Sequence, residues 1–131
     1  MATVKRFEDL EIWIEARLLS KEIILISKTT ELNKDFKLKD QIKGSSGSVM
    51  DNIAEGFKRN GNVEFRQFLS VAKGSAGETR SQLYRVFDNE YIDEQKLNNL
   101  VSEYEKLSIK IHNFITYLNK NDFKGTKYID S

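Results

Sequence analysis

The chain lacks cysteine and proline, and it holds a single histidine among its 131 residues. Without cysteine, the sequence excludes disulfide scaffolds, thiol nucleophiles, cysteine-based zinc sites and iron–sulfur clusters. A lone histidine excludes any site that needs two imidazoles. Di-iron bundles use Glu-x-x-His, but the residue three positions before His112 is Ile109. The sequence therefore predicts no metal site, no cofactor and no catalytic set that spacing alone supports.

Long apolar runs and a strong net charge are also missing. The longest apolar run, Ile23 to Ile26, is too short to cross a bilayer, and the first residues reach Glu8 and Asp9 without an apolar signal segment. We therefore expect a cytoplasmic protein with no membrane contact. The 21 basic and 20 acidic residues nearly cancel, yet the stretch from Lys34 to Arg85 has a net charge of +4. Such a mild excess can support phosphate binding, although a solvated face is its commoner meaning.

Apolar side chains recur every three or four residues over almost the whole chain. The clearest stretch runs from Leu97 to Leu118 and has the spacing of a bundle seam. With no proline to interrupt it, this spacing predicts helices over residues 8–30, 36–58, 63–88 and 93–119. Short connections make neighbouring helices antiparallel. The predicted fold class is all-α, an antiparallel up-and-down four-helix bundle that forms one domain over residues 1–131 with a short polar C-terminal tail.

Particular residues are expected to begin, end and cover these helices. Asp93 should cap the last helix and Asn62 the third, while Gly61 supplies a positive φ at the turn between the second and third. The first helix has a wide apolar stripe, so we expect it to pack against two neighbours. Phe7 and Trp13 have the spacing of a helix interface and are expected to pack on the core.

Small residues interrupt the second and third helices at 44–48 and 74–77. Each glycine in a helix interior costs about 1 kcal/mol relative to alanine. Our interpretation is that the second and third helices approach a neighbour closely at these points. A hinge, or a backbone surface open to a ligand, stays open as the alternative.

Polar residues form a stripe on each of the same two helices. We expect the two stripes to satisfy one another as a structural network that fixes register within the bundle or between subunits. The residues of this network are Ser48, Asn52, Glu55, Arg59, Ser75, Glu78 and Gln82, with Arg85 continuing the second stripe. A carboxylate pair of Glu55 and Glu78 is a weaker enzymatic alternative. A further alternative is a nucleic-acid face made by Lys39, Lys43, Lys58, Arg59, Arg66 and Lys73.

Three blocks of the sequence stand out as motifs. The blocks are Phe7-x-x-Leu10-x-x-Trp13-x-x-Ala16-x-x-Leu19, then Asn52-Ile53-Ala54-Glu55-Gly56-Phe57 followed by Arg59, then Phe68-Leu69-x-x-Ala72-x-Gly74-Ser75-x-x-Glu78-x-x-x-Gln82-Leu83. Together they resemble a known bacterial family, the 23S ribosomal RNA intervening sequence proteins. The resemblance covers about Phe7 to Leu118. Relatives often carry basic residues, alanine and a proline just before the central block, where this chain has the glycine- and serine-containing stretch from Lys43 to Asp51.

The resemblance implies an antiparallel four-helix bundle that assembles into a ring, commonly a pentamer, and whose molecular role is not established. The chain is also similar to accessory proteins of diversity-generating retroelements, which look like basic pentameric barrels that bind nucleic acid. We therefore expect a non-enzymatic, self-assembling scaffold that forms a homo-oligomer. The alternative is an accessory protein that binds RNA or DNA through the weakly basic face. The less basic second helix lowers the expectation of RNA binding.

Overall fold

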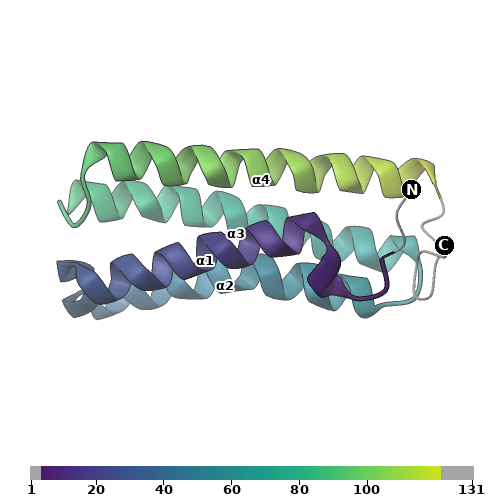
Figure 1. Ribbon diagram of the computed structural model, residues 1–131, viewed down its shortest axis with the longest axis horizontal. Helices are drawn as coiled ribbons and strands as arrows, with labels where there is room; N and C mark the ends of the chain where they lie inside the picture. Colours follow the sequence, from purple (N-terminus) through teal and green to yellow (C-terminus); the bar gives the residue numbers. More distant parts are fainter. Residues whose placement is uncertain (1–3, 122–131) are drawn as a thin grey trace.

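Four long helices lie side by side in the computed structural model, which describes residues 4–121 (Figure 1). The helices are α1 (Glu11–Thr29), α2 (Phe36–Lys58), α3 (Asn62–Asp88) and α4 (Glu94–Lys120), with short 3₁₀ helices η1 (Phe7–Asp9) before α1 and η2 (Glu31–Lys34) before α2. Each helix packs against the next in the chain, and α4 packs back against α1. The predicted all-α, up-and-down four-helix bundle is confirmed. The predicted C-terminal tail lies beyond the described residues.

The first helix begins later than its sequence spacing predicts. Leu10 has extended backbone angles, φ −75° and ψ 128°, and separates η1 from α1. Its side chain is buried in the core. The backbone break therefore lets η1 fold back while Leu10 still contributes to the core.

The caps of α3 and α4 follow different rules. Asp93 caps α4 as predicted, because its Oδ1 accepts a hydrogen bond of 2.8 Å from the backbone amide of Lys96. Gly61 has the predicted positive φ, 99°. The prediction that Asn62 caps α3 is wrong, since Gly61 takes the cap position and Asn62 already lies in the first turn. The Asn62 amide instead donates to the backbone oxygens of Leu118 (3.0 Å) and Asn121 (2.6 Å), which ties the start of α3 to the end of α4.

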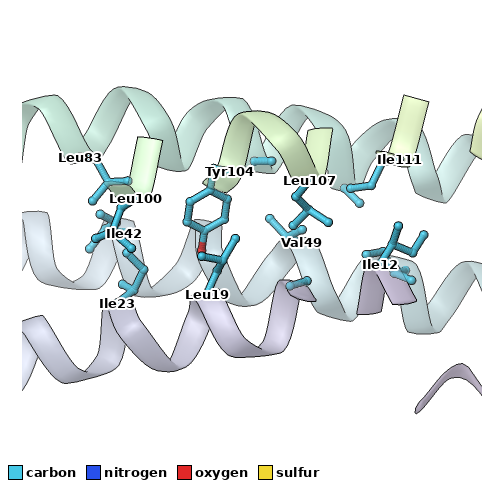
Figure 2. Close-up of a cluster of buried hydrophobic side chains, with 14 of the residues drawn as sticks. Ile12, Leu19, Ile23, Ile42, Val49, Leu83, Leu100, Tyr104, Leu107 and Ile111 are labelled. Carbon is cyan, nitrogen blue, oxygen red and sulfur yellow. The ribbon is translucent and has the colours of Figure 1, made fainter. Parts of the chain in front are cut away.

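The core follows the centre of the bundle along its whole length. Figure 2 shows side chains from all four helices meeting there, with Tyr104 of α4 directed toward Leu19 of α1. The predicted seam of α4 is confirmed, since its buried residues are Leu97, Leu100, Tyr104, Leu107, Ile111 and Leu118. Among residues 4–121, no helix is long and apolar enough to cross a membrane.

The glycines of α2 and α3 do not act as the sequence suggests. A Cβ atom added at Gly44, Gly47, Gly74 or Gly77 would meet nothing within 4 Å. Within one chain, the expected close approach is wrong for these four glycines, whereas Ser45, Ser48 and Ser75 of the same small-residue runs do meet the facing helix. The tight contact is at Gly56, where an added Cβ would stand 2.8 Å from the Phe68 Cβ atom. The two helices therefore approach each other closely near the turn that joins them.

Candidate functional site

A line of hydrogen bonds between side chains joins α2 to α3, and we call it the polar ladder. At its centre, Ser45 Oγ donates to Gln82 Oε1 at 2.6 Å and lies 2.8 Å from Thr79 Oγ1. All three side chains are buried. Ser45 gives its proton to Gln82, and the single proton of Thr79 is shared between Ser45 Oγ and the Ser75 backbone oxygen, which lies 2.9 Å from Thr79 Oγ1.

The polar ladder continues toward both ends of the two helices. Ser75 Oγ donates to Ser48 Oγ at 2.9 Å, and the Asn52 amide donates to the same Ser48 oxygen at 2.9 Å. In the other direction, Arg85 donates to Gln41 Oε1 at 3.0 Å. The polar ladder thus consists of Gln41, Ser45, Ser48 and Asn52 on α2 and of Ser75, Thr79, Gln82 and Arg85 on α3.

The structure brings together part of the predicted network. Ser48, Asn52, Ser75 and Gln82 belong to the polar ladder and reach their partners through hydroxyl and amide groups. Glu55 and Arg59 instead pair with each other along α2, at 2.9 Å and half exposed to solvent. Glu78 is exposed on α3 and has no hydrogen bond or ion pair within residues 4–121.

Sequence reasoning missed three members of the polar ladder, namely Gln41, Ser45 and Thr79. A usable signal was present, because Ser75, Thr79 and Gln82 are spaced four and three and therefore share one face of α3. Ser45 was hidden within the glycine- and serine-rich run. The buried hydroxyls are satisfied by one another, so this interface is built to fix helix register and leaves few groups for a ligand.

The carboxylates of the enzymatic alternative do not face a common hollow. Glu55 lines a hollow of about 320 Å³ between η1, α1 and α2, together with Phe7, Trp13, Met50, Asp51, Ala54 and Lys58, and Glu78 is not part of it. The Phe7 and Trp13 rings form one wall and meet edge to face, 5.2 Å between centroids. Both rings also pack on the core, which confirms that prediction. Across residues 4–121, no group of histidines and carboxylates could hold a metal ion.

The cations of the predicted nucleic-acid face are divided between two sides of the bundle. Lys39 donates to the backbone oxygen of Asn33 at 3.0 Å, and Lys58 lies over the Phe7 ring, so both belong to the side near the segments that flank α1. Arg66 and Lys73 turn toward α4, as the contact of Lys73 Nζ with the His112 ring at 3.2 Å shows.

The remaining two cations are Arg59 and Lys43, of which Lys43 shares a face of α2 with Lys39, four residues before it. The Arg59 guanidinium is engaged by Glu55 and lies over the Phe68 ring, 5.0 Å from its centroid. Lys43 is exposed on α2. Nucleic-acid binding stays a prediction from charge, and this arrangement does not concentrate the charge that it needs.

The outward face of α1 is apolar to an unusual degree. Ile14, Leu18 and Leu25 are 43%, 56% and 49% exposed, and their spacing of four and seven places them in one row. Beside this row, Lys21, Glu22, Ile24, Leu25 and Lys28 line a shallow hollow of about 290 Å³. The prediction that α1 packs against two neighbours is confirmed, since it packs on α2 and α4, and this outer row stays exposed.

The edge between α1 and α4 is held by ion pairs at the surface. Lys110 Nζ of α4 donates to Glu15 at 2.6 Å and to Glu11 at 3.0 Å. The hydrogen bond from Lys110 lowers the pKa of Glu11, and the hydrogen bonds to Glu15 and Glu11 raise the pKa of Lys110. Lys96 makes a similar bond to Glu22 at 3.1 Å.

The Tyr104 hydroxyl is a polar group in the core that has no partner within the described residues. Tyr104 is fully buried, and its hydroxyl makes no hydrogen bond within residues 4–121. Burial raises the pKa of this phenol, because the charged form would lose its hydration. Tyr91, by contrast, donates to Asp35 Oδ2 at 2.9 Å near the start of α2.

Comparison with known proteins identifies a family and a shared fold for this chain. A model of the 23S rRNA-intervening sequence protein family matches residues 8–113. This chain belongs to that family. Among solved structures, a protein of unknown function from the S23 ribosomal protein family of Bacteroides thetaiotaomicron superposes with a TM-score of 0.74 at 22% identity, over 79% of this chain and 97% of that one. This likeness shows the shared fold. No curated protein matches the chain.

Proposed function

We propose that this member of the 23S rRNA-intervening sequence protein family is a non-enzymatic scaffold that assembles with copies of itself into a closed ring. The observation that carries the proposal is the outward row of Ile14, Leu18 and Leu25 on α1. A ring of five is the size that the family resemblance implies.

The apolar row supplies a driving force for assembly. Burying a fully exposed side chain of this size contributes about 1.5–3 kcal/mol, so each of these half-exposed residues contributes about half of that, and every copy provides the same three. Single exposed apolar residues are common on protein surfaces, but a regular row along one helix beside a shallow hollow is typical of a contact surface. A row of this kind on one helix also explains why the stripe of α1 is wider than the bundle core requires.

The polar ladder supports a scaffold in a different way. Its buried hydroxyls pair with each other, so they hold α2 and α3 in register and offer little to a substrate. Glu55 is engaged by Arg59, and Glu78 stands apart from the hollow that Glu55 lines. These placements favour a structural function over two-carboxylate catalysis.

Light scattering coupled to size-exclusion chromatography tests the proposal. The wild-type chain should elute at a multiple of its 15.2 kDa mass at micromolar concentration. Leu18→Glu should dissociate the assembly, because a charge would be buried in the contact. The matched control is Ile109→Glu, which changes a residue of equal exposure (56%) on α4 and should leave the assembly intact. A wild-type protein that stays at 15.2 kDa would contradict the proposal.

A further inference from the structure

Small residues and acids form the outward face of α2, and no packing contact in a single copy requires its two glycines. Asp40, Gly44, Gly47 and Asp51 are spaced four, three and four, so they share one face of the helix. Open space surrounds both glycines, as an added Cβ would meet nothing within 4 Å. Each glycine lowers helix stability by about 1 kcal/mol relative to alanine. Within residues 4–121, neither aspartate has a cationic partner.

The outward face of α1 has the opposite character. Its row continues as Ile14, Leu18, Lys21, Leu25 and Lys28, spaced four, three, four and three. Large apolar side chains alternate with ammonium groups, and neither Lys21 nor Lys28 pairs with a carboxylate in the described part of the chain. The outward face of α1 therefore carries large apolar side chains and positive charge. The outward face of α2 carries glycines without side chains, with an aspartate on either side of them.

We propose that the outward face of α1 in one copy packs against the Gly44–Gly47 face of α2 in the next copy, so that the contact is head to tail. This inference rests on the proposed self-assembly and names the surface that receives the apolar row. Glycines let a facing helix approach closely, so Leu18 of one copy can lie against the α2 backbone of the next. Lys21 then comes within side-chain reach of Asp40, which gives the contact charge complementarity.

The positions of the two faces along the bundle match. Figure 2 shows Ile23 of α1 and Ile42 of α2 at the same place along the bundle axis. Helices α1 and α2 are antiparallel and have the same rise per residue. Leu18 lies five residues before Ile23 on α1, and Gly47 lies five residues after Ile42 on α2. Leu18 and Gly47 are therefore also at the same height along the bundle. The hollow that Trp13 shares with Met50 and Ala54 agrees with this register. A neighbour in the same plane therefore brings Leu18 and Gly47 together without a shift along the axis, as a flat ring requires.

The angle between the two faces also suits ring closure. In a four-helix bundle, neighbouring corners face outward at about 90° to each other. A head-to-tail ring requires about 90° between its two contact directions for four copies and about 108° for five. Helices α1 and α2 occupy neighbouring corners, since each packs against the other. A contact between α1 and the glycines of α3 would join opposite corners and would extend as an open line.

Engineered disulfides test the contact, because the natural chain has no cysteine. An equimolar mixture of Leu18→Cys and Gly47→Cys proteins should form covalent dimers on oxidation. The protein carrying both substitutions should form a series of covalent oligomers whose largest member has the number of copies in the ring. The matched control replaces Gly47→Cys by Gly77→Cys, an exposed glycine of α3, and should give no cross-link.

Two other cross-linking patterns, or a monomeric wild-type protein, would contradict the inference. Dimers from Leu18→Cys alone would indicate a two-fold α1–α1 contact, and cross-links only with Gly77→Cys would place the contact on α3. In both cases self-assembly holds and the head-to-tail contact with α2 is wrong. A monomeric wild-type protein would overturn the proposed function as well.

Exchanging the two charges of the proposed pair provides a second test, and both substitutions are at exposed positions of the single copy. Lys21→Glu and Asp40→Lys should each raise the dissociation constant of the assembly about tenfold or more, and the double variant should recover most of the loss. Glu78→Lys is the control, because it reverses an exposed carboxylate on α3 outside both faces. If the double variant assembles no better than the single variants, the proposed pairing of Lys21 with Asp40 is wrong.

Discussion

The α2–α3 interface and the α1–α4 interface hold the same bundle together by different means. Between α2 and α3, hydroxyl and amide groups pair in the buried region, and Gly56 lets the backbones meet. Between α1 and α4, the polar pairs lie at the solvent edge, and the buried Tyr104 hydroxyl has no partner within the described residues. Buried hydrogen bonds allow only one register, whereas apolar packing with exposed ion pairs tolerates several. The first interface therefore fixes the register of α2 against α3, while the outer row of α1 stays exposed.

The largest effect should come from closing the approach between α2 and α3. Gly56→Ala places a Cβ atom 2.8 Å from the Phe68 Cβ atom and 3.3 Å from the Phe65 backbone oxygen. Overpacking of this kind costs about 2 to 3 kcal/mol, more than the gain in helix propensity. Urea denaturation followed by circular dichroism measures the free energy of unfolding.

The control for Gly56 is the same substitution where there is space. Gly74→Ala should raise the free energy of unfolding by about 1 kcal/mol, because the added methyl group meets nothing and alanine favours the helix. Equal changes at Gly56 and Gly74 would show that the close approach does not constrain the interface.

The next effect should come from removing the centre of the polar ladder. Ser45→Ala deletes the hydroxyl that donates to Gln82, and the buried amide oxygen then has no donor at that position. Leaving a buried polar group unpaired costs about 1 to 2 kcal/mol. Ser81→Ala, on the exposed face of α3, should change stability by less than about 0.5 kcal/mol. If both variants unfold at the same urea concentration, the ladder does not stabilise the α2–α3 interface.

The sequence could predict much of the fold and less of the polar ladder. Apolar spacing locates a seam such as Leu97 to Leu118, because burial must recur on one face of a helix. It cannot tell which outward face stays uncovered, since apolar residues such as Leu18 look the same whether the partner is another helix or another copy. Gly44 and Gly56 are also alike in sequence, and only the position of the neighbouring helix separates an open face from a close approach.

Side-chain reach explains the errors in the polar positions. Glu55 pairs with Arg59 along its own helix, where a four-residue spacing keeps the two groups together without a partner from α3. Short hydroxyls such as Ser45 and Thr79 can meet only where two backbones are close. That distance depends on the packing of the whole bundle, so the pairing of Ser45 with Thr79 does not follow from spacing alone.

Removing the unpaired hydroxyl of Tyr104 should have a smaller effect and should raise, not lower, the free energy of unfolding. Tyr104→Phe removes the polar group and keeps the ring, so we expect the free energy of unfolding to rise by about 1 kcal/mol at neutral pH. Tyr84→Phe, at a half-exposed position on α3, is the control and should have no effect. A loss of stability in Tyr104→Phe would mean that the hydroxyl is paired in solution.

The same variant should alter the response to alkaline pH. Burial holds the folded-state pKa of Tyr104 above the ordinary value of 10.0, so the unfolded chain loses its proton first as the pH rises. The unfolded state then binds fewer protons than the folded state, and stability falls above about pH 10. Urea denaturation between pH 8 and pH 11 should show a shallower fall for Tyr104→Phe than for the wild-type chain, and identical slopes would contradict this role of Tyr104.

The smallest effect should come from the solvent edge of the α1–α4 interface. Lys110→Met removes the hydrogen bonds to Glu11 and Glu15, so the pKa of Glu11 should return toward its ordinary value of 4.5. A carboxylate whose folded-state pKa is lowered stabilises the fold above its unfolded pKa and loses that contribution as the pH falls. The variant should therefore be slightly less stable than the wild-type chain at pH 7, and the difference should vanish near pH 3 and shrink in high salt. Fluorescence of Trp13, the single tryptophan, reports unfolding of α1 directly. Lys106→Met, which breaks only a pair with Glu103 within α4, is the control, and an equal loss in both variants would mean that the ion pairs across the interface add nothing to its stability.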